Sequence, residues 1–129
     1  MRAILIDPKH KQIMQIDYNG DYKTIYEHLS FTNSFGNSHK VRAFDIVRIP
    51  VGNDGIYVDD EGLYAPNEDK HWFTYRYNAH EMHQNFIFPK NIPLVNRGLI
   101  IGCDENGDSV DCDSTVDLIK SQITWGIVR

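Results

Sequence analysis

Short runs of β-branched, aromatic and other apolar residues recur along the chain, and each run is bounded by residues typical of turns. Such runs predict short strands that pair with their neighbours through tight turns. None of them approaches the roughly 20 apolar residues that a membrane-spanning helix requires, so no membrane association is expected. The predicted strand regions lie at 2–7, 12–18, 43–50, 55–65, 71–77, 85–89, 98–104, 108–112 and 123–128. A turn is predicted at 59–62, within the region 55–65, and 108–112 is predicted to pair with 98–104.

A short helix is predicted directly after the second strand. Asp21 is a favourable N-cap, because its carboxylate can accept a hydrogen bond from a free amide of the first turn. Tyr22, Ile25, Tyr26 and Leu29 follow at the i, i+3, i+4, i+7 spacing of one helical stripe. We expect this whole stripe to face the core.

A second helix is predicted near the end of the chain, from about Thr115 to Ser121. Ser114 and Asp117 stand three residues apart, as in a capping box, although Asp replaces the usual Glu or Gln. Two short helices and at least six strands make the expected fold α+β, with a mostly antiparallel sheet. A length of 129 residues suits a single domain over 1–129.

The charge of the chain is unevenly distributed. The net charge is −5, which argues against direct nucleic-acid binding through phosphates. Residues 1–53 carry 7 Lys and Arg against 5 acids, whereas residues 54–129 carry 6 against 13. Twelve of the 18 acids lie in 54–69 and 104–117, and neither stretch holds a Lys or Arg. They predict one negative face if they meet in space, and two solvated loops if they do not.

The segment "LIIGCDENGDSVDCD" first suggests a calcium loop. Asp104, Asn106 and Asp108 match positions 1, 3 and 5 of an EF-hand loop. However, Gly107 stands at position 4 rather than 6, and position 12 is Thr115 rather than a bidentate Glu. The sequence Asn-Gly between two strand-like runs instead predicts a hairpin.

The length of that hairpin loop decides how the two cysteines are placed. A two-residue loop puts Cys103 opposite Val110, so that Cys103 and Cys112 share a face but are too far apart for an easy disulfide. A four-residue loop puts them directly opposite each other. The opening "MRAILIDPKHK" is too short and too soon acidic for a signal peptide, so we expect a cytoplasmic protein with free thiols.

The segment "NAHEMHQN" is the one candidate metal site. His80 and His83 would share a helical face, and Glu81 lies between them. The zincin motif needs histidines four residues apart, so that motif is absent. An exposed polar loop is the competing interpretation. No other segment carries a catalytic motif, and no cofactor is expected.

Three segments resemble, in order, a family of small proteins of unknown function encoded by tailed phages, prophages and mobile elements. They are "MRAILIDP", "VDDEGLY" and "PLVNRGLIIGCDENGDSVD". The insertions around 30–42 and 77–91 look longer than is typical, and 31–42 is predicted to be a long exposed loop. The resemblance implies a role in a bacterial host cell and transfers no catalytic residue.

The leading hypothesis is therefore a small acidic phage-type accessory protein that binds a host or phage macromolecule, with inhibition of host defence as one form. The partner is expected to be a protein, and a homo-oligomer is also open. The alternative is a small-ligand or metal-binding protein, or an enzyme, that uses His80 and His83. The residues predicted to bind the partner are Asp59, Asp60, Glu61, Asp104, Asp108, Trp72 and Tyr75.

Overall fold

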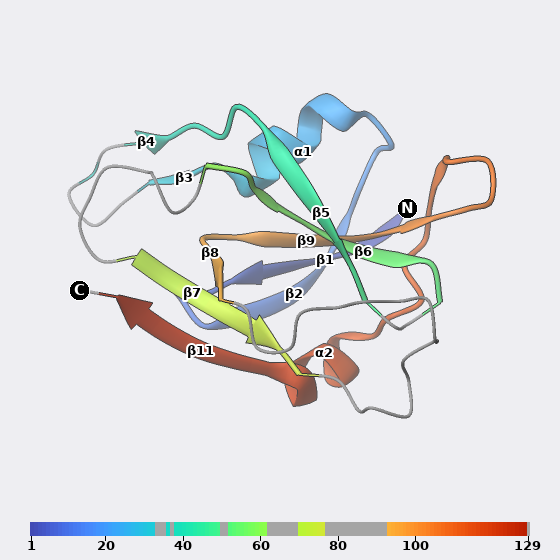
Figure 1. Ribbon diagram of the computed structural model, residues 1–129. Helices are drawn as coiled ribbons and strands as arrows, with labels where there is room; N and C mark the ends of the chain where they lie inside the picture. Colours follow the sequence, from blue (N-terminus) through green and yellow to red (C-terminus); the bar gives the residue numbers. More distant parts are fainter. Residues whose placement is uncertain (33–35, 37, 50–51, 62–69, 77–92, 129) are drawn as a thin grey trace.

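The computed structural model describes residues 1–32, 36, 38–49, 52–61, 70–76 and 93–128. The α+β prediction is confirmed, with two short helices among mostly antiparallel strands (Figure 1). The predicted strand at 85–89 lies outside the described residues. The elements are β1 (Arg2–Asp7), β2 (Gln12–Asp17), α1 (Tyr22–Leu29), β3 (Phe31–Thr32), β4 (Ser38–His39), β5 (Phe44–Arg48), β6 (Asp54–Asp59), β7 (Lys70–Tyr75), β8 (Leu94–Val95), β9 (Gly98–Cys103), β10 (Ser109–Val110), α2 (Val116–Gln122) and β11 (Ile123–Val128).

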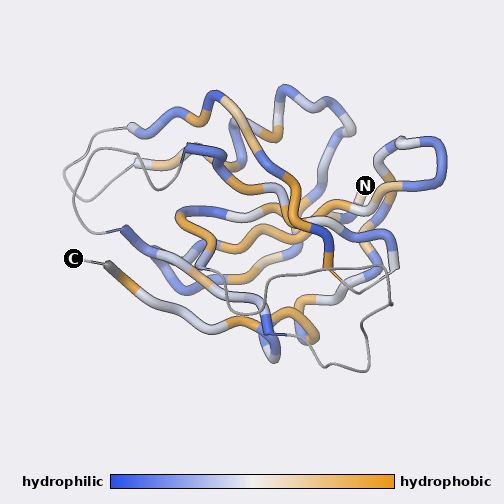
Figure 2. The backbone as a smooth tube through the Cα atoms, in the orientation of Figure 1, coloured by the Kyte–Doolittle hydropathy of each residue, from blue (hydrophilic) through white to orange (hydrophobic). Residues whose placement is uncertain are grey.

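The main sheet is built around β9. Its strand order is β2-β1-β9-β6-β5, every pairing is antiparallel, and β10 extends it by pairing with β9. The β1–β2 and β5–β6 hairpins each pair strands that are close in sequence, and β9 lies between the two hairpins and pairs with β1 and β6. Residues 98–102 are all buried, as expected of a central strand covered on both faces. Figure 2 shows the most apolar backbone in these central strands.

Alternate residues of β1 and β9 pack into separate cores on the two faces of the sheet, because successive side chains of a strand point in opposite directions. Leu99 and Ile101 join the cluster that includes Ile25 and Leu29 of α1. Ile100 joins the cluster that includes Ile119 of α2 and the aromatic residues of β7. The two helices therefore cover opposite faces.

Helix α1 follows its predicted cap but only part of its predicted stripe. The Asp21 carboxylate accepts a hydrogen bond from the Lys23 amide at 3.0 Å. Ile25 and Leu29 are buried, whereas Tyr22 is 59% exposed. The prediction that Tyr22 faces the core is therefore wrong, because the helix reaches the sheet only from Ile25 onward.

Helix α2 begins one residue later than its capping box predicted. The N-cap is Thr115, whose hydroxyl accepts from the Leu118 amide at 3.2 Å. Ser114 is fully buried and donates its hydroxyl to Asp54 instead. A hydroxyl that is committed to a buried carboxylate is not free to cap a helix, and this displaces the cap by one position.

A three-stranded sheet of order β11-β7-β8 packs beside α2, and the β3–β4 ribbon lies at the end of α1 (Figure 1). The ribbon falls in 31–42, which was predicted to be a loop without strands, so that prediction needs correction. Each ribbon strand is only two residues long, too short for a periodic pattern. Within the described residues, neither helix has the length and hydrophobicity needed to cross a membrane.

Candidate functional site

The turn at Asp59–Glu61 and the β9–β10 hairpin lie at opposite ends of the β6–β9 pair, whereas Asp54, at the start of β6, lies beside Asp113 and Ser114. In the antiparallel register, Asp54 lies opposite Gly102 and Val58 lies opposite Gly98. The turn after β6 is therefore at the end where β9 starts, and the β9–β10 hairpin is at the end where β9 stops. At about 3.3 Å per residue, the length of a six-residue strand separates the two clusters. Among the described residues, these two clusters do not form one continuous negative face, and Glu68 and Asp69 lie outside that part of the chain.

The turn after β6 uses its first carboxylate internally. Asp59 is buried, and its Oδ2 lies 2.8 Å from Nε2 of His39, while its Oδ1 accepts from the Glu61 amide at 3.0 Å. Asp60 and Glu61 are exposed. A hydrogen bond shared with Asp60 raises the pKa of Asp45, and burial and the negative charge of Asp60 raise it further. Asp59 is thus a structural carboxylate and is not available to a partner.

The hairpin at the other end has a loop of three residues, 105–107. Ser109 pairs with Cys103, and Val110 pairs with Gly102. Both the two-residue and the four-residue loops predicted from Asn106-Gly107 are therefore wrong. Gly107 adopts a φ of 85°, the left-handed conformation that a three-residue hairpin loop requires at its last position.

Asp104 explains why the loop has this length. One oxygen of its carboxylate accepts from the amides of Asn106 and Asp108, both at 2.9 Å. Its own amide donates to the Asp108 carbonyl at 2.9 Å, and its carbonyl accepts from the Gly107 amide at 3.1 Å. The residue that resembled the first ligand of a calcium loop is thus the centre of a hydrogen-bonded turn.

The register also separates the two cysteines, both of which are free thiols. Cys103 follows Leu99 and Ile101 on the α1 face of β9, whereas Cys112 belongs to the core under α2. The prediction that they share a face is therefore wrong. Burial raises the pKa of the Cys112 thiol, so this group is a poor nucleophile.

Several other carboxylates of the hairpin region hold the structure together. The Asp111 side chain accepts from the Arg2 amide at 2.7 Å, and that of Asp113 accepts from the Asn53 amide at 3.2 Å. By contrast, the side chains of Glu105 and Asp108 are exposed and make no hydrogen bond or ion pair with any residue that the structure describes.

The two predicted aromatic contact residues are placed on β7. Tyr75 is buried, with 1% of its surface exposed, so it cannot serve as an exposed anchor. Trp72 is partly exposed and lies directly opposite Gly126 of β11. A β-carbon at Gly126 would come within 1.9 Å of the indole ring, so the ring covers that strand closely.

The candidate metal residues His80 and His83 lie outside the described residues. Among the residues that are described, no group of three or more His, Cys, Asp or Glu side chains is placed to hold a metal ion. The metal hypothesis therefore stays a prediction from the sequence.

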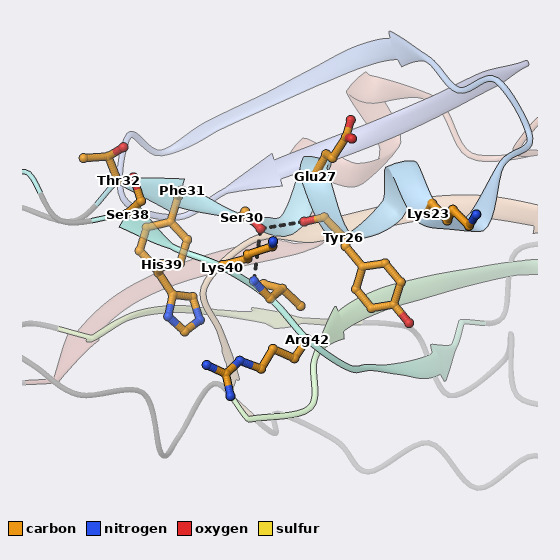
Figure 3. A pocket seen from close by; sticks show the side chains of 11 residues that line it. Lys23, Tyr26, Glu27, Ser30, Phe31, Thr32, Ser38, His39, Lys40 and Arg42 are labelled. Atoms are coloured by element: carbon orange, nitrogen blue, oxygen red, sulfur yellow. Dashed lines mark hydrogen bonds between the residues drawn. The ribbon is translucent and has the colours of Figure 1, made fainter.

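A groove that the sequence did not predict runs between α1 and residues 38–42 (Figure 3). It has a volume of about 840 Å³. The sequence contains its parts, namely the stripe of α1 and the basic residues around His39, but it does not show that the two segments are adjacent. The lining residues are Lys23, Tyr26, Glu27, Ser30, Phe31, Thr32, Ser38, His39, Lys40, Val41 and Arg42.

Comparisons of this chain with protein-family models, with curated proteins and with solved structures each found no match.

Proposed function

We propose that this protein is a non-enzymatic binding protein that places its acidic β9–β10 hairpin against a basic surface of a macromolecular partner. The observation that supports this proposal is that the side chains of Glu105 and Asp108 are exposed on a hydrogen-bonded turn and make no ion pair with any described residue. The resemblance of the sequence to small phage and mobile-element proteins makes a host or phage protein the expected partner. Inhibition of a host defence factor is one concrete form of this role.

The hairpin suits such a role because its shape is fixed before any partner binds. The hydrogen bonds centred on Asp104 hold the loop, and the hairpin projects from the body beside the amino terminus (Figure 1). A preformed loop loses little conformational entropy on association. Unpaired carboxylates at its tip would also steer it toward a positive surface, so that association becomes faster at low salt.

The turn after β6 is a weaker candidate. Asp59 is bonded to His39, and Asp60 lies next to the carboxyl group of Asp45, whose pKa it raises. Glu61 is exposed, and its side chain makes no hydrogen bond or ion pair with the described residues. We therefore assign partner binding to the hairpin and use the turn as a control.

The test is capture of partners from a bacterial lysate by the immobilised protein, with quantitative mass spectrometry. The variant Glu105→Lys with Asp108→Lys reverses the hairpin charge, and Asp60→Lys with Glu61→Lys makes the same change of net charge at the other end. We expect a specific captured protein to be lost with the hairpin variant and kept with the control. Equal capture by both variants, or equal loss, would refute the assignment.

A further inference from the structure

The groove beside α1 is held open by hydrogen bonds within its own walls. The Ser30 hydroxyl donates to the Tyr26 carbonyl at 2.7 Å and accepts from the Val41 amide at 3.0 Å (Figure 3). The Ser30 carbonyl in turn accepts from the Arg97 guanidinium at 3.0 Å. These bonds therefore fix the end of the helix relative to the facing segment.

Aromatic rings form the apolar part of the groove. Phe31 packs on His39 with ring centroids 5.1 Å apart, and Tyr26 packs on Phe44 at 5.2 Å. Because His39 is also bonded to Asp59, its ring is held in place from behind. A ligand that packs against aromatic rings already held in place gains contact area, and the protein loses little side-chain entropy on binding.

Positive charge surrounds these rings. Lys23, Lys40 and Arg42 line the groove, and Glu27 is the only acid among the lining residues. None of the three cations is ion-paired or hydrogen-bonded through its side chain within the described part of the chain. On a protein with a net charge of −5, three cations against one acid give the lining of this groove a net positive charge.

We propose that this groove binds an acidic peptide segment of another protein, in which an apolar or aromatic residue lies against Tyr26 and Phe31. The carboxylates of that segment would face Lys40 and Arg42, where charge-assisted hydrogen bonds can form. This site goes beyond the proposed function, because it lies on a different surface and selects the opposite charge.

The chemistry of the groove favours a peptide over the other anionic ligands. A small molecule is usually enclosed over most of its surface, whereas this groove is more open than enclosed. A nucleic acid would bring a dense row of phosphates toward a protein whose net charge is negative. A short acidic segment needs only the local positive charge and the aromatic surface that are present.

The test uses two synthetic probes, Ac-Trp-Glu-Asp-Glu-Asp-NH2 and its neutral counterpart Ac-Trp-Gln-Asn-Gln-Asn-NH2. Each is titrated into the whole ¹⁵N-labelled protein, and binding is followed by amide chemical-shift changes. We expect the acidic probe to shift the signals of α1 and of residues 38–42. The affinity should fall by roughly tenfold or more in Lys40→Glu with Arg42→Glu, because two charge-assisted contacts are reversed.

The matched control is Arg48→Glu with Lys120→Glu, which changes the net charge equally at two exposed positions outside the groove. This control should keep at least most of the affinity. An equal loss of affinity in both variants would show that the acidic probe responds only to the net charge of the protein, and it would overturn the proposal. Equal binding of the neutral probe would also overturn the proposal, as would a single-stranded oligonucleotide that displaces the acidic probe and binds more tightly. If the same signals shift with protein concentration when no probe is present, the groove is a site of self-association, and the proposal is again overturned.

Discussion

Asp54 is the buried carboxylate that ties the segment before α2 to the main sheet. One of its oxygens accepts from the Asp113 amide at 2.8 Å, and the other accepts from the Ser114 amide at 2.7 Å and from the Ser114 hydroxyl. Asp54 is 1% exposed and Ser114 is 0% exposed. Water therefore cannot replace this carboxylate at Ser114, although it can reach the exposed Asp113.

We expect Asp54→Ala to lower the free energy of unfolding by about 2–6 kcal/mol. The substitution leaves two buried donors of Ser114 without an acceptor, and each unsatisfied buried donor costs roughly 1–3 kcal/mol. Such a loss would be a large part of the roughly 5–15 kcal/mol that stabilises a typical domain. Asp54→Asn keeps one acceptor oxygen toward Ser114, so we expect it to cost less than half as much.

The assay is urea unfolding followed by circular dichroism and tryptophan fluorescence. Asp108→Ala, at an exposed carboxylate, is the control and should change stability by no more than about 0.5 kcal/mol. A double-mutant cycle with Ser114→Ala should give a clear coupling energy, because the two side chains share a hydrogen bond. A loss below about 1 kcal/mol for Asp54→Ala, or additive single effects in the cycle, would refute the reasoning.

Three further predictions concern other parts of the structure. Gly126→Ala should destabilise the protein by about 1–3 kcal/mol and alter the fluorescence of Trp72, because the new methyl group would overlap its ring; unchanged urea unfolding and emission would contradict this. Burial raises the pKa of Asp7, but hydrogen bonds from His10 and the neighbouring Arg97 guanidinium outweigh it, so that the folded pKa lies below the unfolded value of 3.8. The ionised Asp7 should therefore stabilise the protein above pH 3.8, and this stabilisation should be lost as the pH falls through the folded pKa. Asp7→Asn should make the free energy of unfolding depend less steeply on pH in the acid range, and an unchanged slope would count against this role of Asp7. In native protein, a thiol reagent should modify Cys103 well before the buried Cys112, and mild oxidation should give no intramolecular disulfide by mass spectrometry.

Local patterns were enough to predict the elements whose determinants lie within a few residues. The first hairpin, the helix after it and the Asp21 cap all depend on contacts at short separation, and the structure has each of them. The Asn106-Gly107 pair correctly predicted a hairpin there. Both predicted loop lengths, two and four residues, were wrong, because the Asp104 carboxylate accepts hydrogen bonds from two amides, those of Asn106 and Asp108, and so holds a three-residue loop.

The roles of individual carboxylates could not be predicted in the same way. Asp59 and Asp108 look alike in the sequence, each within an acidic stretch next to a turn. What distinguishes them is a contact with His39, which is 20 residues from Asp59. The groove has the same origin, because Val41 meets Ser30 only after the chain has passed through the β3–β4 ribbon.

The central position of β9 has a consequence for how the chain acquires its structure during synthesis. The β1–β2 and β5–β6 hairpins can each form locally, but they are joined only through β9, which comes about ninety residues after β1. While a ribosome is still making residues 1–97, both hairpins expose the strand edges that β9 later occupies. The main sheet can therefore be completed only after residues 98–103 have been made, and its long-range pairing is expected to place refolding in the slower, millisecond-to-second range of small domains.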